Sequence, residues 1–269
     1  MHGLSPADGS RAGRVAREVD WSKTSEDYAL HRPGYPASSY ERLRALGVGV
    51  ETQRVLDLGA GTGTLAREFA KNGCQVTGVD IAEGQIAKAR ELAARDGLNV
   101  DFRVAPAEQT GLPDNSFDII SAGQCWLYFD NKRVIPEILR LLAPAGKLLT
   151  CHLCWLPRLD EIARRSEELV LRHNPEWSGS DWDGGVPAMP AWAGERFRLA
   201  GMFFYDEPIL FTRVSWRGRF RACRGIGATL SAGQVADFDT EHERLLDETV
   251  PEVFTVLHRV DAHILEPLG

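Results

Sequence analysis

The sequence of 269 residues predicts an α/β fold, in which a mostly parallel sheet of seven strands is covered by helices on both faces. Three observations predict this fold. Strand and helix patterns alternate between residues 36 and 153, the strand segments are short and mostly apolar, and glycines end two of the helices. Strands buried on both faces read as apolar runs, and alternating strands and helices build parallel sheets.

The first half of the chain contains five expected strands with helices before and between them. A helix is expected at Pro36–Leu46, because proline is tolerated in the first helical turn. The strands are expected at Arg54–Leu58, Gln75–Val79, Val100–Val104, Phe117–Ser121 and Lys147–Leu153. The further helices are expected at Thr62–Asn72, closed by Gly73, at Glu83–Asp96, stopped by Gly97, and at Asn131–Leu142, where Val134, Ile138 and Leu141 share one face.

After Trp155 the pattern is less regular. The expected elements are an amphipathic helix at Leu159–His173, a loop rich in Trp, Gly and Pro, a strand at Phe197–Val214 broken at Pro208, a helix that opens at Ser231, and a last strand at Val253–Leu257. Gln234 lies three residues after Ser231, which is the spacing of a capping box.

We therefore expect four parts in the chain. Residues 1–48 form an N-terminal arm and a lid helix, and residues 49–154 form the core. Residues 155–250 form an insertion after the fifth strand that caps the site, and residues 251–269 supply the strand that completes the sheet.

Composition excludes several classes of protein. The formal net charge of −7 argues against a nucleic-acid partner. The first twenty residues hold no apolar run typical of a signal peptide, and no stretch of about 18 apolar residues predicts a membrane span. Five cysteines, an odd number, indicate reduced thiols in a cytoplasmic protein. Cys151 and Cys154 point to opposite faces of an expected strand, so no metal site is predicted.

The segment VLDLGAGTGTLA places Gly59, Gly61 and Gly63 between an expected strand and helix. Such a turn tolerates positive φ and brings backbone N–H groups and a helix N-terminus close to a ligand. Asp57 precedes the glycines, and Asp80 ends the next strand at the offset where an acid binds ribose hydroxyls. A glycine turn of this kind also occurs in NAD(P)-binding proteins and in folds without a ligand.

These residues resemble the class I S-adenosylmethionine-dependent methyltransferases, strongly over residues 50–153. The resemblance implies a Rossmann-like fold with S-adenosylmethionine as cofactor. It also implies that the loop Gly59–Gly63 packs on the methionine part of the cofactor and that Asp80 binds the ribose. Asp57 would hold the loop and the cofactor ammonium group, and Ile81 would lie on the adenine.

Three further segments are similar to the same family. Ala107 and Glu108 match the stretch beside the adenine amino group, while Gln124 and Trp126 match the loop beside the reactive methyl group. The segment YALHRPGYP resembles the N-terminal lid of small-molecule methyltransferases such as the trans-aconitate enzyme, which implies that Tyr28 and Arg32 contact the cofactor. Alternatively, these two are ordinary surface residues of a terminal arm.

The region after Trp155 is expected to determine the substrate. With Trp155 itself it holds five of the seven tryptophans, and Trp182 and Trp216 are candidates, together with Tyr128, for an apolar substrate pocket. The alternative is that these aromatic residues form a core.

In the segment FTRVSWRGRFRACRGIG, a helix from Ser215 would align Trp216, Phe220 and Cys223 in one stripe. Arg217, Arg221 and Arg224 would form a second stripe, which suits a carboxylate or phosphate group on the substrate. The alternative is a solvated basic face balanced by the acids of FDTEHERLLDE.

His152 is the first candidate for a general base, because it follows the fifth strand, and Glu167 is the second. The predicted function is methyl transfer to a small, anionic organic molecule, with an oxygen or nitrogen acceptor favoured, by a monomer or homodimer. One alternative is carbon methylation of a prenyl diphosphate with a Glu base. The other is a non-catalytic protein that binds S-adenosylmethionine.

Overall fold

The computed structural model describes residue 27 and residues 30–268, which form two compact units. The core unit comprises Gly34–Leu153, Pro187–Phe204 and the residues from Val260 onward. The cap unit comprises Cys154–Val186, Tyr205–Arg259 and the described residues before Gly34.

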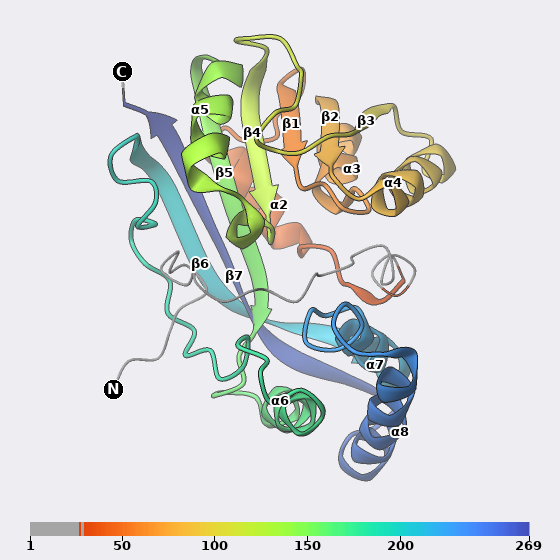
Figure 1. The fold of residues 1–269 in the computed structure, drawn as a ribbon. Coiled ribbons are helices and arrows are strands. Elements are labelled where there is room, and N and C mark those ends of the chain that lie inside the picture. The colour runs from red at the N-terminus through yellow and green to blue at the C-terminus, as the bar shows by residue number, and fades with distance from the viewer. Residues whose placement is uncertain (1–26, 28–29, 269) are drawn as a thin grey trace. The chain divides into compact units, whose positions relative to one another are not determined.

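A seven-stranded sheet has the order β3-β2-β1-β4-β5-β7-β6 (Figure 1). Its strands are β1 (Arg54–Leu58), β2 (Gln75–Asp80), β3 (Val100–Val104), β4 (Phe117–Gly123), β5 (Leu142–Trp155), β6 (Phe197–Thr212) and β7 (Val253–Pro267). β1 pairs in parallel with β2 and β4, as does β2 with β3 and β4 with β5. The arrow of β7 points opposite to that of β5 (Figure 1). The predicted mostly parallel seven-stranded sheet is confirmed.

The last two strands differ from the sequence prediction. β6 continues through Pro208, so the predicted break is wrong. β6 is an edge strand, where a residue without a backbone N–H is tolerated. The last strand was predicted to end at Leu257 but extends to Pro267. Its second half carries buried His and Asp side chains between the apolar ones, which interrupts the apolar run.

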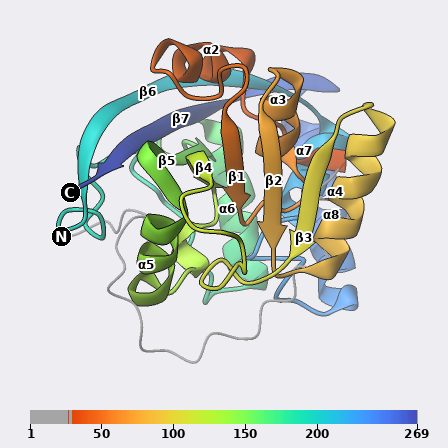
Figure 2. The same cartoon turned by 90° about the horizontal axis from the view of Figure 1, so that it is seen from above.

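Helices cover both faces of the core-unit sheet. On one face, α2 (Ala37–Ala45), α3 (Thr64–Lys71) and α4 (Glu83–Arg95) contribute buried residues such as Tyr40, Phe69 and Ile86 to one apolar cluster. On the other, α5 (Asn131–Leu141) contributes Ile138 and its neighbours to a second cluster. Figure 2 shows α2 and α3 on the side of the sheet opposite α5. The predicted helices on both faces are confirmed.

The cap unit has its own apolar core. Its helices are α6 (Glu161–His173), α7 (Arg213–Arg221) and α8 (Ala232–Thr249). The predicted stripe of Trp216, Phe220 and Cys223 is buried in this core beside Trp155 and Phe238. α7 begins at Arg213, two residues before the predicted start, because Thr212 and Ser215 form a capping box there.

The compact units differ from the four parts expected from the sequence. The helix Ala37–Ala45 and residues 187–204 belong to the core unit, so the cap unit is not one continuous insertion. The chain passes between the units within the long strands β6 and β7, where no loop or linker composition marks the boundary. Among the residues that the structure describes, no helix is both long and apolar enough to cross a membrane.

The predicted capping box at the start of α8 is confirmed, and it gives a stability prediction. The Ser231 hydroxyl accepts from the Gln234 backbone N–H, and the Gln234 side chain accepts from the Ser231 backbone N–H. Ser231→Ala should lower the free energy of unfolding by about 1 kcal/mol, since an N-terminal donor loses its partner. Urea unfolding measures this change. Thr240→Ala, in the middle of the same helix, is the control and should not destabilise. Equal losses in both variants would contradict the prediction.

Candidate cofactor and methyl-transfer site

The glycine loop joins β1 to α3 with a backbone that only glycine adopts easily. Gly59, Gly61 and Gly63 have φ angles of 63°, 54° and 78°. Neighbouring side chains also leave no room for a Cβ atom. At Gly59 it would lie 2.8 Å from the sulfur of Cys125, and at Gly63 it would lie 2.6 Å from the ring of Phe102. The loop therefore presents bare backbone at the N-terminus of a helix, which suits close approach of a ligand.

A carboxylate at the end of β2 is bonded directly to this loop. Asp80 accepts from the backbone N–H of Gly61 at 2.9 Å and from that of Ala82 at 2.8 Å. Burial raises the pKa of Asp80, against the effect of these hydrogen bonds. The adjacent Ile81 is 71% exposed, an unusual position for a large apolar side chain. The loop, an acid and an apolar surface thus meet at the carboxyl end of β1 and β2.

Asp57 lies beneath the loop as a buried acid. It is 2% exposed and accepts from the Ser121 hydroxyl at 2.7 Å, its partner in the β1–β4 register. Burial raises the pKa of Asp57 to about 7, although Ser121 and the backbone of Ala66 favour the charged form. Its protonation state therefore responds to anything that brings a positive charge to the site.

The loop after β4 is fastened to β5. Gln124 has a φ of 64°, and its backbone N–H donates to the Cys151 carbonyl at 3.0 Å while its side chain donates to the Leu153 carbonyl at 2.7 Å. Trp126 is buried, and its ring stacks on Trp192 with centroids 3.7 Å apart. Trp126 thus contacts protein on one face of its ring.

Glu108 connects two loops at the same edge of the sheet. Its side chain accepts from the backbone N–H of Asp130 at 2.9 Å, and Asp130 in turn caps α5. Ala107 beside it is buried. This bond connects the loop that precedes β4 with the loop that follows it.

The structure does not test the two remaining candidates for cofactor binding. Tyr28 lies outside the described residues, and Arg32 belongs to the cap unit. Both roles stay predictions. Two core-unit residues that sequence reasoning missed lie beside the predicted ones. The Tyr35 hydroxyl donates to the Cys151 carbonyl at 2.9 Å, and the Cys125 thiol donates to the Leu58 carbonyl at 3.2 Å. Tyr35 stands in the lid-like segment YALHRPGYP, which was the available signal.

His152, the first candidate base, lies on β5 next to an acid that the sequence did not indicate. Its Nδ1 is 2.9 Å from Oδ1 of Asp261 on β7. The His152 side chain is 30% exposed, whereas that of Asp261 is 5% exposed. Burial opposes the charged imidazole, but the charge and hydrogen bond of Asp261 outweigh it and raise the pKa of His152. Asp261 was missed because the last strand was predicted to end before it.

Glu167, the second candidate base, is buried in the cap unit with both oxygens bonded. It accepts from the Trp155 indole at 2.6 Å and from the Asp181 backbone N–H at 2.8 Å. Burial raises its pKa. These bonds connect α6 to the tryptophan-rich loop, which favours a structural role for Glu167.

The aromatic substrate candidates divide into exposed and buried residues. Tyr128 is 44% exposed in the loop after β4, whereas Trp182 and Trp216 in the cap unit are 8% and 0% exposed. The Trp216 indole donates to the Ser166 hydroxyl at 3.0 Å. For Trp216 the structure favours the alternative of a core residue over contact with a substrate.

The arginine stripe is largely neutralised within the cap unit. Arg217 pairs with Asp239 and Glu243, and Arg221 pairs with Asp239 and Asp27. Arg224 has a long contact of 3.5 Å with the Ser178 hydroxyl. Asp239 and Glu243 belong to the acidic segment on α8, so Arg217 and Arg221 match the alternative of a basic face balanced by acids.

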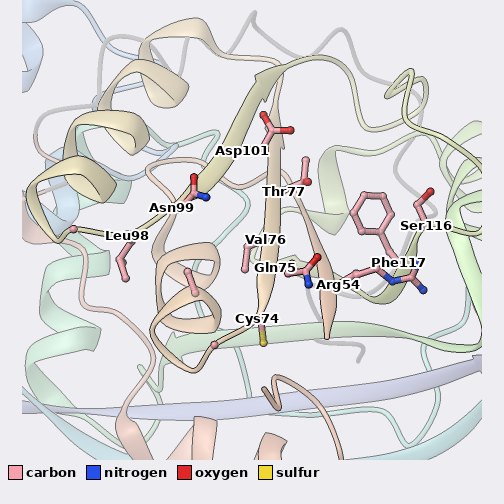
Figure 3. A pocket seen from close by; sticks show the side chains of 13 residues that line it. Arg54, Cys74, Gln75, Val76, Thr77, Leu98, Asn99, Asp101, Ser116 and Phe117 are labelled. Carbon is pink, nitrogen blue, oxygen red and sulfur yellow. The ribbon is translucent and has the colours of Figure 1, made fainter. Parts of the chain in front are cut away.

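A hollow with a volume of about 740 Å³ lies elsewhere on the core unit (Figure 3). Residues at the starts of four strands line it, among them Arg54, Gln75, Asp101 and Phe117. Ligands of open α/β sheets bind at the carboxyl ends of the strands, and this hollow lies at the amino ends. It is therefore distinct from the site that the glycine loop defines. Among the described residues, no group of three or more His, Cys, Asp or Glu side chains suits a metal ion.

Known proteins similar to this chain identify its family. The model of the methyltransferase domain family matches residues 56–150. The ubiquinone biosynthesis O-methyltransferase of Xanthomonas axonopodis pv. citri is 31% identical over 204 residues, which cover 75% of this chain and 82% of that enzyme.

Solved structures agree. A protein of Anaeromyxobacter dehalogenans described as a type II methyltransferase is 24% identical, with a TM-score of 0.55, and the match covers 87% of this chain and 96% of that one. An S-adenosylmethionine-dependent methyltransferase of Geobacter sulfurreducens, solved with S-adenosyl-L-homocysteine, is 19% identical with a TM-score of 0.50 over 92% of this chain and 97% of that one. The chain belongs to the class I S-adenosylmethionine-dependent methyltransferases. It is an enzyme whose cofactor is S-adenosylmethionine.

Proposed function

We propose that the enzyme transfers the methyl group to an oxygen or nitrogen atom of a small organic molecule, at the carboxyl edge of the core-unit sheet. One observation carries the proposal: side chains at the ends of three strands gather at this edge. Asp80 ends β2, Gln124 follows β4, and His152 lies near the end of β5. An open α/β sheet binds its ligands in this position, where the strand order reverses between β1 and β4.

The residues at the edge fit S-adenosylmethionine. The Gly59–Gly63 loop presents bare backbone with positive φ angles at the start of α3, and Asp80 already has one carboxylate oxygen on that loop. Asp80 would bind the ribose hydroxyls, Ile81 would cover the adenine, and Asp57 would balance the ammonium group. The cofactor supplies an activated methyl group, so the protein mainly aligns the acceptor and excludes water.

An oxygen or nitrogen acceptor is favoured over carbon methylation of a prenyl diphosphate. That alternative needs arginines to hold the diphosphate and a Glu as base. Arg217 and Arg221 are paired with carboxylates, and both oxygens of Glu167 accept hydrogen bonds. The O-methyltransferase of Xanthomonas supports an oxygen acceptor as the first class to test.

Isothermal titration with S-adenosylhomocysteine tests the cofactor site. Asp80→Asn should weaken binding by about 100-fold, because a charged group that hydrogen-bonds the ligand is worth about 3 kcal/mol. Asp101→Asn, an exposed acid at the start of β3, is the control and should bind like the wild type. Acceptors are then screened with methyl-labelled S-adenosylmethionine against phenols, amines and carboxylic acids. Tight binding by Asp80→Asn, or transfer only to carbon, would contradict the proposal.

A further inference from the structure

We propose that His152 and Asp261 act together as the proton acceptor of the reaction, and that the acceptor molecule therefore carries a hydroxyl or amine that must lose a proton. His152 would be a catalytic residue and Asp261 a positioning residue. The inference rests on the proposed function and adds a chemical class of substrate to it. A carboxylic acid, which is ionised at neutral pH, would not need such a pair.

The register of the sheet places His152 at the edge where transfer is proposed. Gly123 of β4 is paired with Cys151 of β5, and His152 is the next residue of β5 after this last pair. Gln124 also bonds to the carbonyls of Cys151 and Leu153, the two residues that flank His152. The backbone on both sides of His152 is thus bonded to the loop after β4, at the edge of the sheet where we propose that transfer occurs.

The Asp261 carboxylate determines which nitrogen of His152 accepts a proton. A carboxylate accepts hydrogen bonds, so its 2.9 Å contact with Nδ1 keeps the proton on that nitrogen. Nε2 is then the basic nitrogen, and the side chain is 30% exposed. An imidazole held in this way by a buried acid is oriented, and its protonated form is stabilised.

His152 differs from the other described histidine of the core unit. His263 is 2% exposed, and its Nε2 lies 2.7 Å from the Pro187 carbonyl. In the cap unit, burial lowers the pKa of both His242 and His258 to about 3, so neither holds a proton near neutral pH. Asp261 is the charged group that acts on His152 among the described residues.

The proposed step balances without another reactant. The acceptor oxygen forms a bond to the methyl carbon as the carbon–sulfur bond breaks, and the electron pair of that bond stays on sulfur. The proton of the hydroxyl moves to Nε2 of His152 and is later released to solvent. For an amine, the proton leaves the nitrogen in the same way.

A pH titration of His152 by NMR, with isotope-labelled histidine, tests the pair without any acceptor. Its pKa should lie above the ordinary histidine value and should fall by about one pH unit or more in Asp261→Asn, because a nearby carboxylate is removed. His242 of the cap unit, whose pKa is lowered to about 3 by burial, is the internal reference and should be unaffected by the substitution. An ordinary pKa that is insensitive to Asp261→Asn would overturn the inference.

Measurements of kcat test the role of His152 in the reaction. With catechol as acceptor, His152→Gln should lower kcat by about 100-fold or more, the usual contribution of a general base. The defect should shrink with 4-nitrocatechol, whose hydroxyl is largely ionised at the assay pH. The kcat of the wild type should rise with pH as His152 loses its proton. This rising part of the pH profile should be absent in His152→Gln. His173→Gln is the matched control and should keep full activity.

Binding of S-adenosylhomocysteine shows whether a negative result contradicts only the proposed base or the proposed function as well. If His152→Gln binds it like the wild type but keeps its kcat on catechol, the base is wrong while the proposed function stands. If the wild type methylates only carboxylic acids, the proton-accepting pair is likewise overturned. If the wild type does not bind S-adenosylhomocysteine, the proposed function itself fails.

Discussion

Replacing Trp216 with alanine should lower the free energy of unfolding by about 4 kcal/mol, the usual cost of removing a buried Trp side chain. The side chain is fully buried, and its ring centroid lies 4.8 Å from that of Phe211, 5.0 Å from Phe220 and 5.6 Å from Trp155. The indole N–H donates to Ser166. Alanine would leave a cavity and a buried hydroxyl with one partner fewer. Urea unfolding with a calorimetric check measures the loss.

Two further variants separate packing from hydrogen bonding. Trp216→Phe keeps a ring but loses the donor and part of the volume, so its cost should lie between that of Trp216→Ala and zero. Leu210→Ala removes an apolar side chain that is 68% exposed on β6, and should change stability by less than about 0.5 kcal/mol.

The outcome also decides between the two interpretations of Trp216. If Trp216→Ala keeps its stability but raises KM for the acceptor, the residue contacts the substrate as the sequence predicted. If Trp216→Ala loses much stability and Trp216→Phe keeps the KM of the wild type, Trp216 is a core residue. Burial and the Ser166 contact favour the second result.

Local sequence patterns predicted most of the helices and strands. The helices of the core unit and its first four strands lie within a few residues of their predicted bounds, because each depends on short apolar periods and on glycines at helix ends. β7 was underestimated because its buried polar side chains have partners far along the chain. Asp261 meets His152, and His263 meets the Pro187 carbonyl. The hydrophobic periodicity of a segment does not predict contacts with residues far away in the sequence.

The candidate site shows the same limit. The glycine loop and the position of Asp80 beside it were predictable because both depend on spacing within one strand–helix–strand unit. The base was predicted without its partner, since His152 and Asp261 are 109 residues apart. The stripe of Arg217 and Arg221 was also predicted, but its role depends on whether acids face it. Asp239 does face both, from a helix that the sequence placed without its orientation.

The buried acid under the glycine loop should make cofactor binding depend on pH. The pKa of Asp57 is raised from 3.8 to about 7, so the folded, ligand-free protein keeps a proton that the unfolded chain releases. Its contribution to stability is complete below the unfolded pKa and is lost as the pH rises through the folded pKa. The loss is of the order of 4 kcal/mol, because each pH unit between the two values costs about 1.4 kcal/mol.

A bound cofactor with an ammonium group reverses this preference, because it favours the charged form of Asp57. We therefore expect affinity for S-adenosylhomocysteine to fall by up to about 100-fold from pH 7.5 to about pH 5, a factor of ten for each unit below the pKa. Asp57→Asn keeps the shape and a partner for Ser121 but does not titrate.

Isothermal titration across this pH range compares the two proteins, with proton release measured in buffers of different ionisation enthalpy. The wild type should release a proton on binding near pH 6, and Asp57→Asn should release none. The variant should also lose less stability than the wild type between about pH 4 and pH 7, because the group responsible for the linkage is absent. Parallel affinity curves for both proteins would mean that another group titrates on binding, and Asp57 would then serve only to hold β1 to β4 through Ser121.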